Sequence, residues 1–251
     1  MRVLITNDDG IDSPGLRALA DMARGQGHDV AVAAPCWDSS GSSSSVTGVS
    51  KVGDVVTEPR RWTGWPDGSV RAVDATPALI ALMAVRERFG AAPDIVLSGI
   101  NRGANTGRAI LHSGTVGAAF TAFQHGCPAL AVSLAVREDS TDLHWATAAD
   151  VACRLFKWMS DAPRPAVVNC NVPDLPLDQL KGIRQGRLDL LGTFQTSMTE
   201  QTGRSVPTTV TEGESAGEDT EGALLERGFA CVTALIPVVE DAAVDFAAVL
   251  E

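Results

Sequence analysis

The chain has 251 residues, 45% of them hydrophobic and 20% charged, which suits one large α/β domain or a domain with an appended arm. Its formal net charge of -11 excludes nucleic acid polymers held on a broad basic face, so a phosphate ligand has to be bound locally. Because an apolar strand without a preceding basic and apolar leader pattern comes first, we expect no leader segment, and no apolar run approaches the roughly 20 residues that cross a bilayer. We therefore expect a cytoplasmic protein with no membrane partner.

Residues 1–45 predict a strand, a helix, a second strand and a loop. An apolar run at 2–6 is followed by apolar residues at helical spacing up to Gly25 and by a strand at 28–35 that a proline ends. Such a unit places both strands parallel in one sheet. The serine-rich loop 36–45 comes next. We favour a ligand-binding loop over a flexible linker, because it follows a strand of the same unit as the first one.

The alternation of strands and helices continues through the middle of the chain. Residues 46–73 are irregular and indicate a hairpin or an excursion from the sheet. Beyond them we expect helices at 77–89, 117–124 and 147–159, strands at 93–98, 128–134 and 166–173, and a glycine-rich turn at 99–107. The sequence thus predicts an α/β fold with a mostly parallel sheet flanked by helices.

The pattern changes beyond Gly182. Residues 193–222 are polar and lack helical periodicity, which indicates an extended arm. A last strand at 229–235 precedes a short helical tail. We therefore divide the chain into a core, 1–182, and a C-terminal segment, 183–251, that is not an independent domain.

Asp8 and Asp9 are adjacent carboxylates at the expected carboxyl end of the first strand. There they repel each other and lose hydration, a cost that a divalent cation with oxygen ligands offsets. The alternative is an Asx-type turn in which Gly10 takes a positive φ. Taken alone, the acid pair does not decide between the two.

Three loops follow predicted parallel strands and meet at one edge of the sheet, those after Thr6, Ala34 and Ser98. Together, Asp8, Asp9, a loop serine and Asn101 offer carboxylate, hydroxyl and amide oxygens, a set suited to magnesium, manganese or calcium. Such a cation polarises a phosphoryl group and lowers the pKa of bound water.

A phosphate also needs hydrogen-bond donors. The predicted helix that starts after Ser113-Gly114-Thr115 offers free backbone N–H groups and the favourable end of the helix dipole. The alternatives are an ordinary N-cap for Ser113 and a structural imidazole for His112. The sequence contains neither a dinucleotide-binding nor a P-loop glycine motif.

Three ordered motifs resemble the SurE (survival protein E) family of metal-dependent nucleotidases. They are Thr6-Asn7-Asp8-Asp9-Gly10, the segment 98–105 (SGINRGAN) and the segment 112–119 (HSGTVGAA), and 169–173 (NCNVP) resembles that family's NxNxP strand. The resemblance implies a Rossmann-like core with a C-terminal hairpin arm that is often exchanged between subunits of a homodimer or homotetramer. It also implies hydrolysis of nucleoside monophosphates to nucleoside and phosphate.

The resemblance also implies a site. Alignment of Pro35 and Gly41 with the family's loop places a serine ligand at Ser40, so one magnesium or manganese ion per subunit, or calcium in a crystal, would be held by Asp8, Asp9, Ser40 and Asn101. The phosphate would be bound by Asn105, Ser113, Gly114 and Thr115. The catalytic residues would be Asp8, Asp9, Asn105 and His112, with a metal-bound water as the alternative to His112 for protonating the leaving group.

The chain departs from the family pattern around this site. Cys36 replaces an aspartate, Ser39 an arginine and Ala109 an aspartate, and the chain contains no tyrosine. These changes leave open a specialised phosphorylated metabolite or sugar phosphate as substrate. A different class of function, a non-catalytic module that binds nucleotide phosphates, is the second alternative.

Overall fold

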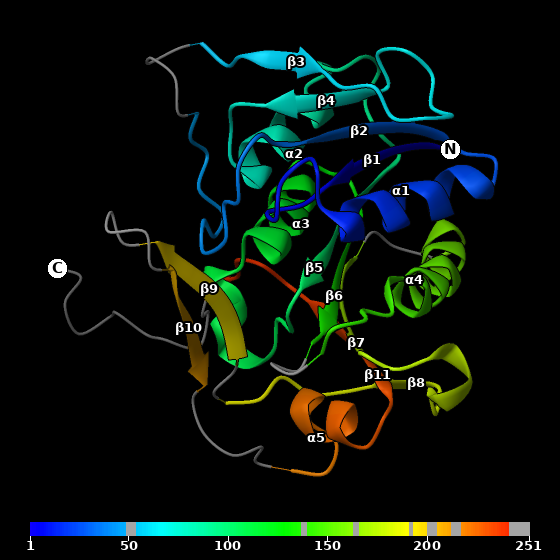
Figure 1. Ribbon diagram of the computed structural model, residues 1–251, viewed down its shortest axis with the longest axis vertical. Coiled ribbons are helices and arrows are strands. Elements are labelled where there is room, and N and C mark those ends of the chain that lie inside the picture. The colour runs from blue at the N-terminus through cyan, green and yellow to red at the C-terminus, as the bar shows by residue number, and fades with distance from the viewer. Residues whose placement is uncertain are drawn as a thin grey trace, which may run out of the picture.

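The computed structural model describes residues 1–48, 54–136, 140–162, 166–190, 193–199, 205–211 and 217–240. Within these ranges a nine-stranded sheet has the order β3-β4-β2-β1-β5-β6-β7-β11-β8, and β9 and β10 form a separate two-stranded sheet (Figure 1). The strands are β1 (Arg2–Thr6), β2 (Asp29–Pro35), β3 (Thr57–Pro59), β4 (Val70–Val73), β5 (Ile95–Arg102), β6 (Ala129–Ala135), β7 (Val167–Pro173), β8 (Ile183–Gln185), β9 (Thr193–Thr199), β10 (Ser205–Thr211) and β11 (Ala230–Leu235).

Helices connect these strands and cover both faces of the large sheet (Figure 1). The α-helices are α1 (Pro14–Gly25), α2 (Pro77–Val85), α3 (Gly114–Gln124), α4 (Trp145–Ser160) and α5 (Glu221–Glu226), and the 3-10 helices are η1 (Gly107–His112) and η2 (Leu177–Gln179). None of the helices in the described ranges is long and apolar enough to cross a membrane.

The sheet is mostly parallel, as predicted. Pairing is parallel from β4 through β2, β1, β5 and β6 to β7, and antiparallel at β3–β4 and β7–β11. Along the parallel part the strand order reverses between β1 and β5, because the chain first builds outward from β1 to β2 and β4 and then returns to the other side of β1. This is the arrangement of a doubly wound sheet.

Side chains of β1 alternate between two cores. Val3 and Ile5 pack in the cluster that contains Leu16 of α1 and Phe156 of α4. Leu4 points to the opposite face, into the cluster that contains α2 and α3. A strand buried on both faces is apolar at every position, which explains the continuous apolar run seen in the sequence.

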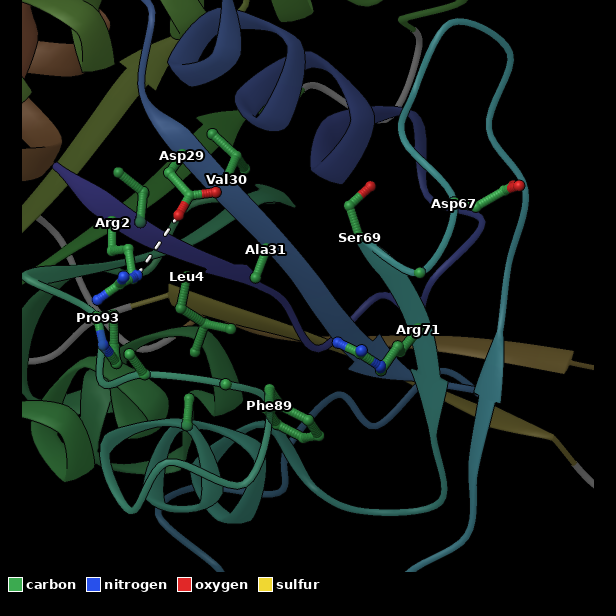
Figure 2. A pocket seen from close by; sticks show the side chains of 15 residues that line it. Arg2, Leu4, Asp29, Val30, Ala31, Asp67, Ser69, Arg71, Phe89 and Pro93 are labelled. Carbon is green, nitrogen blue, oxygen red and sulfur yellow. Dashed lines mark ion pairs between the residues drawn. The ribbon is translucent and has the colours of Figure 1, made fainter.

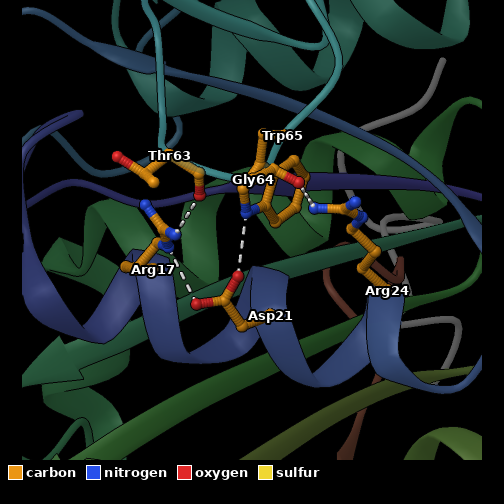
Figure 3. Close-up of polar contacts among 6 residues, drawn as sticks. All are labelled: Arg17, Asp21, Arg24, Thr63, Gly64 and Trp65. Atoms are coloured by element: carbon orange, nitrogen blue, oxygen red, sulfur yellow. Dashed lines mark hydrogen bonds and ion pairs between the residues drawn. The ribbon is translucent and has the colours of Figure 1, made fainter.

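The connection between β3 and β4 is fastened to α1 by aromatic and charged groups (Figure 3). Trp65 Nε1 donates to Asp21 Oδ1 at 2.8 Å, and Arg17 Nη2 donates to Thr63 O at 3.1 Å. The Arg17 guanidinium also lies 4.8 Å from the ring centre of Trp62, a cation–π distance. The described part of the irregular segment, residues 46–48 and 54–73, is thus an excursion that carries the edge strand β3 and its neighbour β4, and its residues 62–65 pack on α1.

The C-terminal segment forms the hairpin and then returns to the sheet. β9 and β10 pair antiparallel, which confirms the hairpin arm. β11 lies between β7, with which it is antiparallel, and β8, with which it is parallel. The boundary at 182 stays a prediction.

Three expectations need correction. The helix predicted at 77–89 ends at Val85, because the chain turns through Glu87, whose φ is 61°. The turn predicted at 99–107 is partly strand, since β5 runs to Arg102 with a register shift between Ser98 and Asn101. Residues 236–240 show no helix, and the rest of the expected helical tail, 241–251, lies outside the described residues.

Candidate active site

The carboxyl ends of β1 and β5 lie where the strand order reverses. In doubly wound sheets, ligands bind in the crevice outside this point, because the connections leave in opposite directions. Asp8 and Asp9 follow β1, and Asn101 is in the last part of β5. Three of the predicted metal ligands therefore reach the same edge of the sheet from adjacent strands.

The turn after β1 shows the geometry of the turn alternative. Asn7 Nδ2 donates to Gly10 O at 3.1 Å, and Gly10 has a φ of 96°. Only glycine adopts such a φ without strain. The turn uses Asn7 and Gly10 and leaves both carboxylates to other partners, so the turn and the metal site are compatible.

Asp8 is held against the first turn of α3. Thr115 donates its backbone N–H to Asp8 Oδ2 at 3.1 Å and its hydroxyl to Asp8 Oδ1 at 2.5 Å. Asp8 is 3% exposed, and its burial raises its pKa although the Thr115 bonds act in the opposite direction. A carboxylate oxygen can accept a second partner, so these bonds orient Asp8 and leave it able to bind a cation. The predicted phosphate contact of Thr115 stays a prediction.

Asp9 is the less buried acid of the pair. Its Oδ2 accepts the backbone N–H of Arg102 at 3.1 Å. Burial, and then the negative charge of Asp8, raise the pKa of Asp9 from 3.8 to about 8. Two neighbouring acids with raised pKa values describe a site short of positive charge. A divalent cation would supply that charge and lower both pKa values.

The serine-rich loop is fastened to the acid pair. Ser39 donates its N–H and its hydroxyl to the backbone carbonyl of Asp8, at 2.7 and 3.1 Å. Ser40 donates its N–H and its hydroxyl to Asp38 Oδ1, at 2.9 and 2.5 Å. Ser40 Oγ keeps its lone pairs for a cation. Ser39, at the position of the family's arginine, thus braces the loop with neutral hydrogen bonds.

Ser42 presents a second hydroxyl that the sequence did not single out. Its Oγ is buried and makes no hydrogen bond to the part of the chain that the structure describes. A Cβ on Gly114 would lie 2.7 Å from Ser42 Oγ and 2.8 Å from Asp8 Oδ2. Both oxygens therefore face one small space at the start of α3, which the glycine keeps open. In a run of four serines, no sequence signal distinguishes this one.

The two asparagines of the glycine-rich segment differ in their surroundings. Asn101 Nδ2 donates to Gly103 O at 2.8 Å, so the amide oxygen is the atom left for a cation. Asn105 is 3% exposed, and its Nδ2 donates to Ser133 Oγ at 2.9 Å. The side chain of Asn105 is therefore oriented by β6, and its phosphate role stays a prediction.

The start of α3 combines a cap with an open donor. Ser113 Oγ accepts the N–H of Val116 at 3.1 Å, which is the N-cap that we considered as the alternative. The N–H of Gly114 makes no hydrogen bond to any residue in the described ranges, so it can bind an anion. His112 is exposed at the end of η1, and its carbonyl accepts the N–H of Ser43 at 3.2 Å.

The donor set fits a hard divalent cation. The predicted ligands Asp8, Asp9, Ser40 and Asn101 offer carboxylate, hydroxyl and amide oxygens, and the pKa values of both acids are raised, that of Asp9 in spite of the nearby Arg102 charge. In the described ranges, no three His, Cys, Asp or Glu side chains gather as a metal-binding group.

A cavity of about 310 Å³ lies at the opposite, amino-terminal edge of the parallel strands (Figure 2). Residues of β1, β2 and β4 line it together with Phe89 from the segment after α2. Arg2 and Asp29 form an ion pair there, with 3.4 Å between Nε and Oδ2. None of the predicted site residues lines this cavity.

A family model described as "Survival protein SurE" matches residues 3–192. The chain belongs to the SurE family. The 5'-nucleotidase SurE of Aeromonas hydrophila subsp. hydrophila is 38% identical over 246 residues, covering 94% of this chain and 92% of the relative. The 5'/3'-nucleotidase SurE of Serratia proteamaculans is 37% identical over 241 residues, covering 94% and 90%.

A solved structure extends the similarity to the fold. The crystal structure of the SurE protein from Aquifex aeolicus has a TM-score of 0.75 to this chain, with 28% sequence identity, and covers 97% of this chain and 96% of its own. The SurE fold thus includes the returning C-terminal segment.

The returning C-terminal segment holds one residue that sequence reasoning missed. Glu221 falls in the polar stretch predicted as an arm, yet it is 0% exposed and contacts the start of η1.

Proposed function

We propose that this SurE-family chain is a divalent-metal-dependent phosphomonoesterase that hydrolyses nucleoside monophosphates to nucleoside and phosphate. One observation carries the proposal: two adjacent acids with raised pKa values lie at the switch point of the sheet, and Thr115 at the start of α3 holds one of them. The relatives of this chain that are named 5'/3'-nucleotidase SurE support the substrate class.

The cation would be held by Asp8, Asp9, Ser40 and Asn101. When bound, it supplies positive charge that polarises the phosphoryl group and activates water. The Thr115 hydroxyl and N–H fix the direction of the Asp8 carboxylate. Ser40 lies on a loop that Ser39 attaches to the Asp8 carbonyl by two hydrogen bonds. These bonds fix the position of the Ser40 loop relative to Asp8.

The phosphate would lie at the N-terminus of α3. The Gly114 N–H and the positive end of the α3 dipole face an incoming phosphate oxygen, and the absence of a side chain at Gly114 lets it approach. Water attacks phosphorus and releases a proton to the solvent, the ester P–O bond breaks, and the leaving alkoxide takes up a proton. His112 directly precedes Ser113, and we propose that it donates this proton to the leaving group.

We further propose one magnesium or manganese ion per subunit and a cytoplasmic location. We also propose a homodimer or homotetramer built through the C-terminal arm. The hairpin supports the arm's role, because β9 and β10 pair with each other and stand outside the nine-stranded sheet.

The test measures phosphate release from nucleoside monophosphates, sugar phosphates and an aryl phosphate with magnesium, manganese or EDTA. We expect turnover of nucleotides that EDTA abolishes and that falls by at least about a thousandfold in Asp8→Asn, because the variant weakens charge stabilisation in the transition state. Asp12→Asn, which changes an exposed acid four residues further on, is the matched control.

Each other outcome rejects a stated part of the proposal. Preference for a sugar phosphate over every nucleotide would favour the specialised-metabolite alternative, which Cys36, Ser39 and Ala109 suggested. Nucleotide binding without phosphate release, with or without metal, would identify a non-catalytic binding module. Full activity in Asp8→Asn would reject the metal-centred mechanism.

A further inference from the structure

Glu221 is a completely buried acid in the returning C-terminal segment. It is the first residue of α5, and its exposed fraction is 0%. Its Oε2 accepts the backbone N–H of Gly107 at 2.7 Å. Its Oε1 accepts the Thr233 hydroxyl at 3.0 Å and Asn169 Nδ2 at 3.2 Å. One carboxylate therefore joins η1, β11 and β7.

The segment that Glu221 contacts belongs to the candidate active site. Gly107 begins η1, which ends at His112, directly before the cap of α3. Two residues before Gly107, the Asn105 carbonyl accepts Asn169 Nδ2 at 2.9 Å and Asn171 Nδ2 at 2.8 Å. Asn169 donates to both Glu221 and Asn105, so the carboxylate and the strand fix residues 105–107 together.

Burial of a carboxylate costs free energy of hydration, which its hydrogen bonds have to offset. Burial raises the pKa of Glu221 from 4.5 to about 7, even though three hydrogen bonds favour the charged form. A carboxylate has four acceptor positions and no donor, which suits a place where three donors from three elements converge. Glutamine in the same place would direct its NH2 group at one of those donors and leave that donor without an acceptor.

We propose that Glu221 is a positioning residue: it fixes the backbone of residues 105–107, which carries Asn105, and, through η1, the placement of His112 at the phosphate site. The C-terminal segment is then a working part of the active site. The inference rests on the proposed phosphomonoesterase function and adds a residue that the family motifs do not contain.

The first test compares two variants of α5 that should lose similar stability. Glu221→Gln changes the acceptor and keeps the shape, whereas Leu224→Ala removes apolar contact from a buried residue of the same helix. We expect Glu221→Gln to lower kcat about tenfold to a hundredfold while manganese affinity, followed by electron paramagnetic resonance, changes less than twofold. Leu224→Ala should lower the melting temperature by a similar amount and keep kcat within about threefold. Glu226→Gln, at the exposed end of α5, is the charge control.

The second test does not depend on turnover. Amide hydrogen exchange, followed by mass spectrometry, should be at least tenfold faster for residues 105–112 in Glu221→Gln than in the unchanged protein or in Leu224→Ala. Unchanged kcat in Glu221→Gln overturns the inference, as does an equal loss of kcat in Leu224→Ala. If the unchanged protein releases no phosphate, the proposed function fails, and the exchange rates alone decide whether Glu221 positions this segment.

Discussion

The two edges of the parallel sheet hold charge in opposite ways. At the amino-terminal edge, Arg2 and Asp29 form an ion pair of opposite charges whose side chains are 53% and 78% exposed. At the carboxyl edge, Asp8 and Asp9 have like charge and raised pKa values. Water and a partner stabilise the first pair, whereas burial raises the pKa of both acids of the second pair, and the nearby Arg102 charge only partly offsets this at Asp9.

The two edges of the parallel sheet also differ in how much empty space they enclose. The cavity at the amino-terminal edge has a volume of about 310 Å³ and is lined by none of the predicted site residues (Figure 2). At the carboxyl edge the atoms are crowded, since a single Cβ on Gly114 would lie under 3 Å from Asp8 and Ser42. The candidate active site therefore does not coincide with this cavity, and its raised pKa values, not a large volume, distinguish it.

Among the variants that compare the two edges, one that fills the crowded space at the carboxyl edge should have the largest effect. In Gly114→Ala the new Cβ would lie 2.8 Å from both Cβ and Oδ2 of Asp8, so the acid or the helix start has to move. A displacement of that kind costs on the order of a hundredfold in catalysis. We expect this loss in kcat/KM, measured by phosphate release.

Gly25→Ala is the matched control for this substitution. A Cβ at Gly25 would have no atom within 4 Å, so the variant tests alanine without crowding. Its kcat/KM should stay within twofold. Equal losses in the two variants would show that the space beside Asp8 has no special role.

Removing the hydroxyl that holds Asp8 should have the next largest effect. Thr115→Val keeps the shape and the backbone N–H but removes the 2.5 Å bond to Oδ1. Partners that orient a metal ligand are worth about tenfold to a hundredfold in affinity or activity. Manganese titration should show this loss in Thr115→Val. Thr121→Val, which removes a hydroxyl bonded to the Gly117 carbonyl in the same helix, should leave the affinity unchanged.

Local patterns predicted the elements of the core because their signals are strong over short ranges. The strand at 2–6 matches β1, and the apolar spacing before Gly25 matches α1. The edge strands β3 and β8 have three residues each, and at that length period-2 alternation carries almost no information. The strand order could not be read locally, since it depends on pairings such as Thr6 with Ser98.

The candidate site was predictable where residue type and strand position coincide. Asp8, Asp9 and Asn101 met both conditions, so the sequence predicted that they lie at the carboxyl edge of the sheet. Ser42 and Glu221 met neither. Ser42 is one of several neighbouring serines, and Glu221 lies in a polar stretch whose burial depends on contacts with Gly107 and Thr233 far away in sequence. Tertiary contacts of this kind leave no local pattern.

Metal binding at the carboxyl edge should depend on pH. With the pKa of Asp9 raised to about 8, the metal-free protein carries a proton there at pH 6 to 7, and a cation has to displace it. Affinity for manganese should therefore rise with pH up to about 8, by as much as tenfold per unit for one proton released. Calorimetry in buffers of different ionisation enthalpy measures that proton.

The stability of the metal-free protein should change in the opposite sense. Because the folded protein binds the Asp9 proton more tightly than the unfolded chain does, the free energy of unfolding should fall as pH rises from about 4 to about 8. Asp9→Asn should weaken both pH dependences. Manganese affinity that is constant from pH 6 to 8 would contradict the raised pKa.

The smallest effect is expected at the amino-terminal edge. Asp29→Asn breaks the 3.4 Å ion pair with Arg2, but both side chains are more than half exposed, so water replaces the lost partner. Exposed pairs contribute about 0 to 1 kcal/mol, and urea denaturation should show a change in this range. Phosphate release should stay within twofold, because the pair lies at the far end of β1 from Asp8. A tenfold loss of activity would mean that charge at the amino-terminal edge reaches the active site along β1, and the two edges could then no longer be treated as independent.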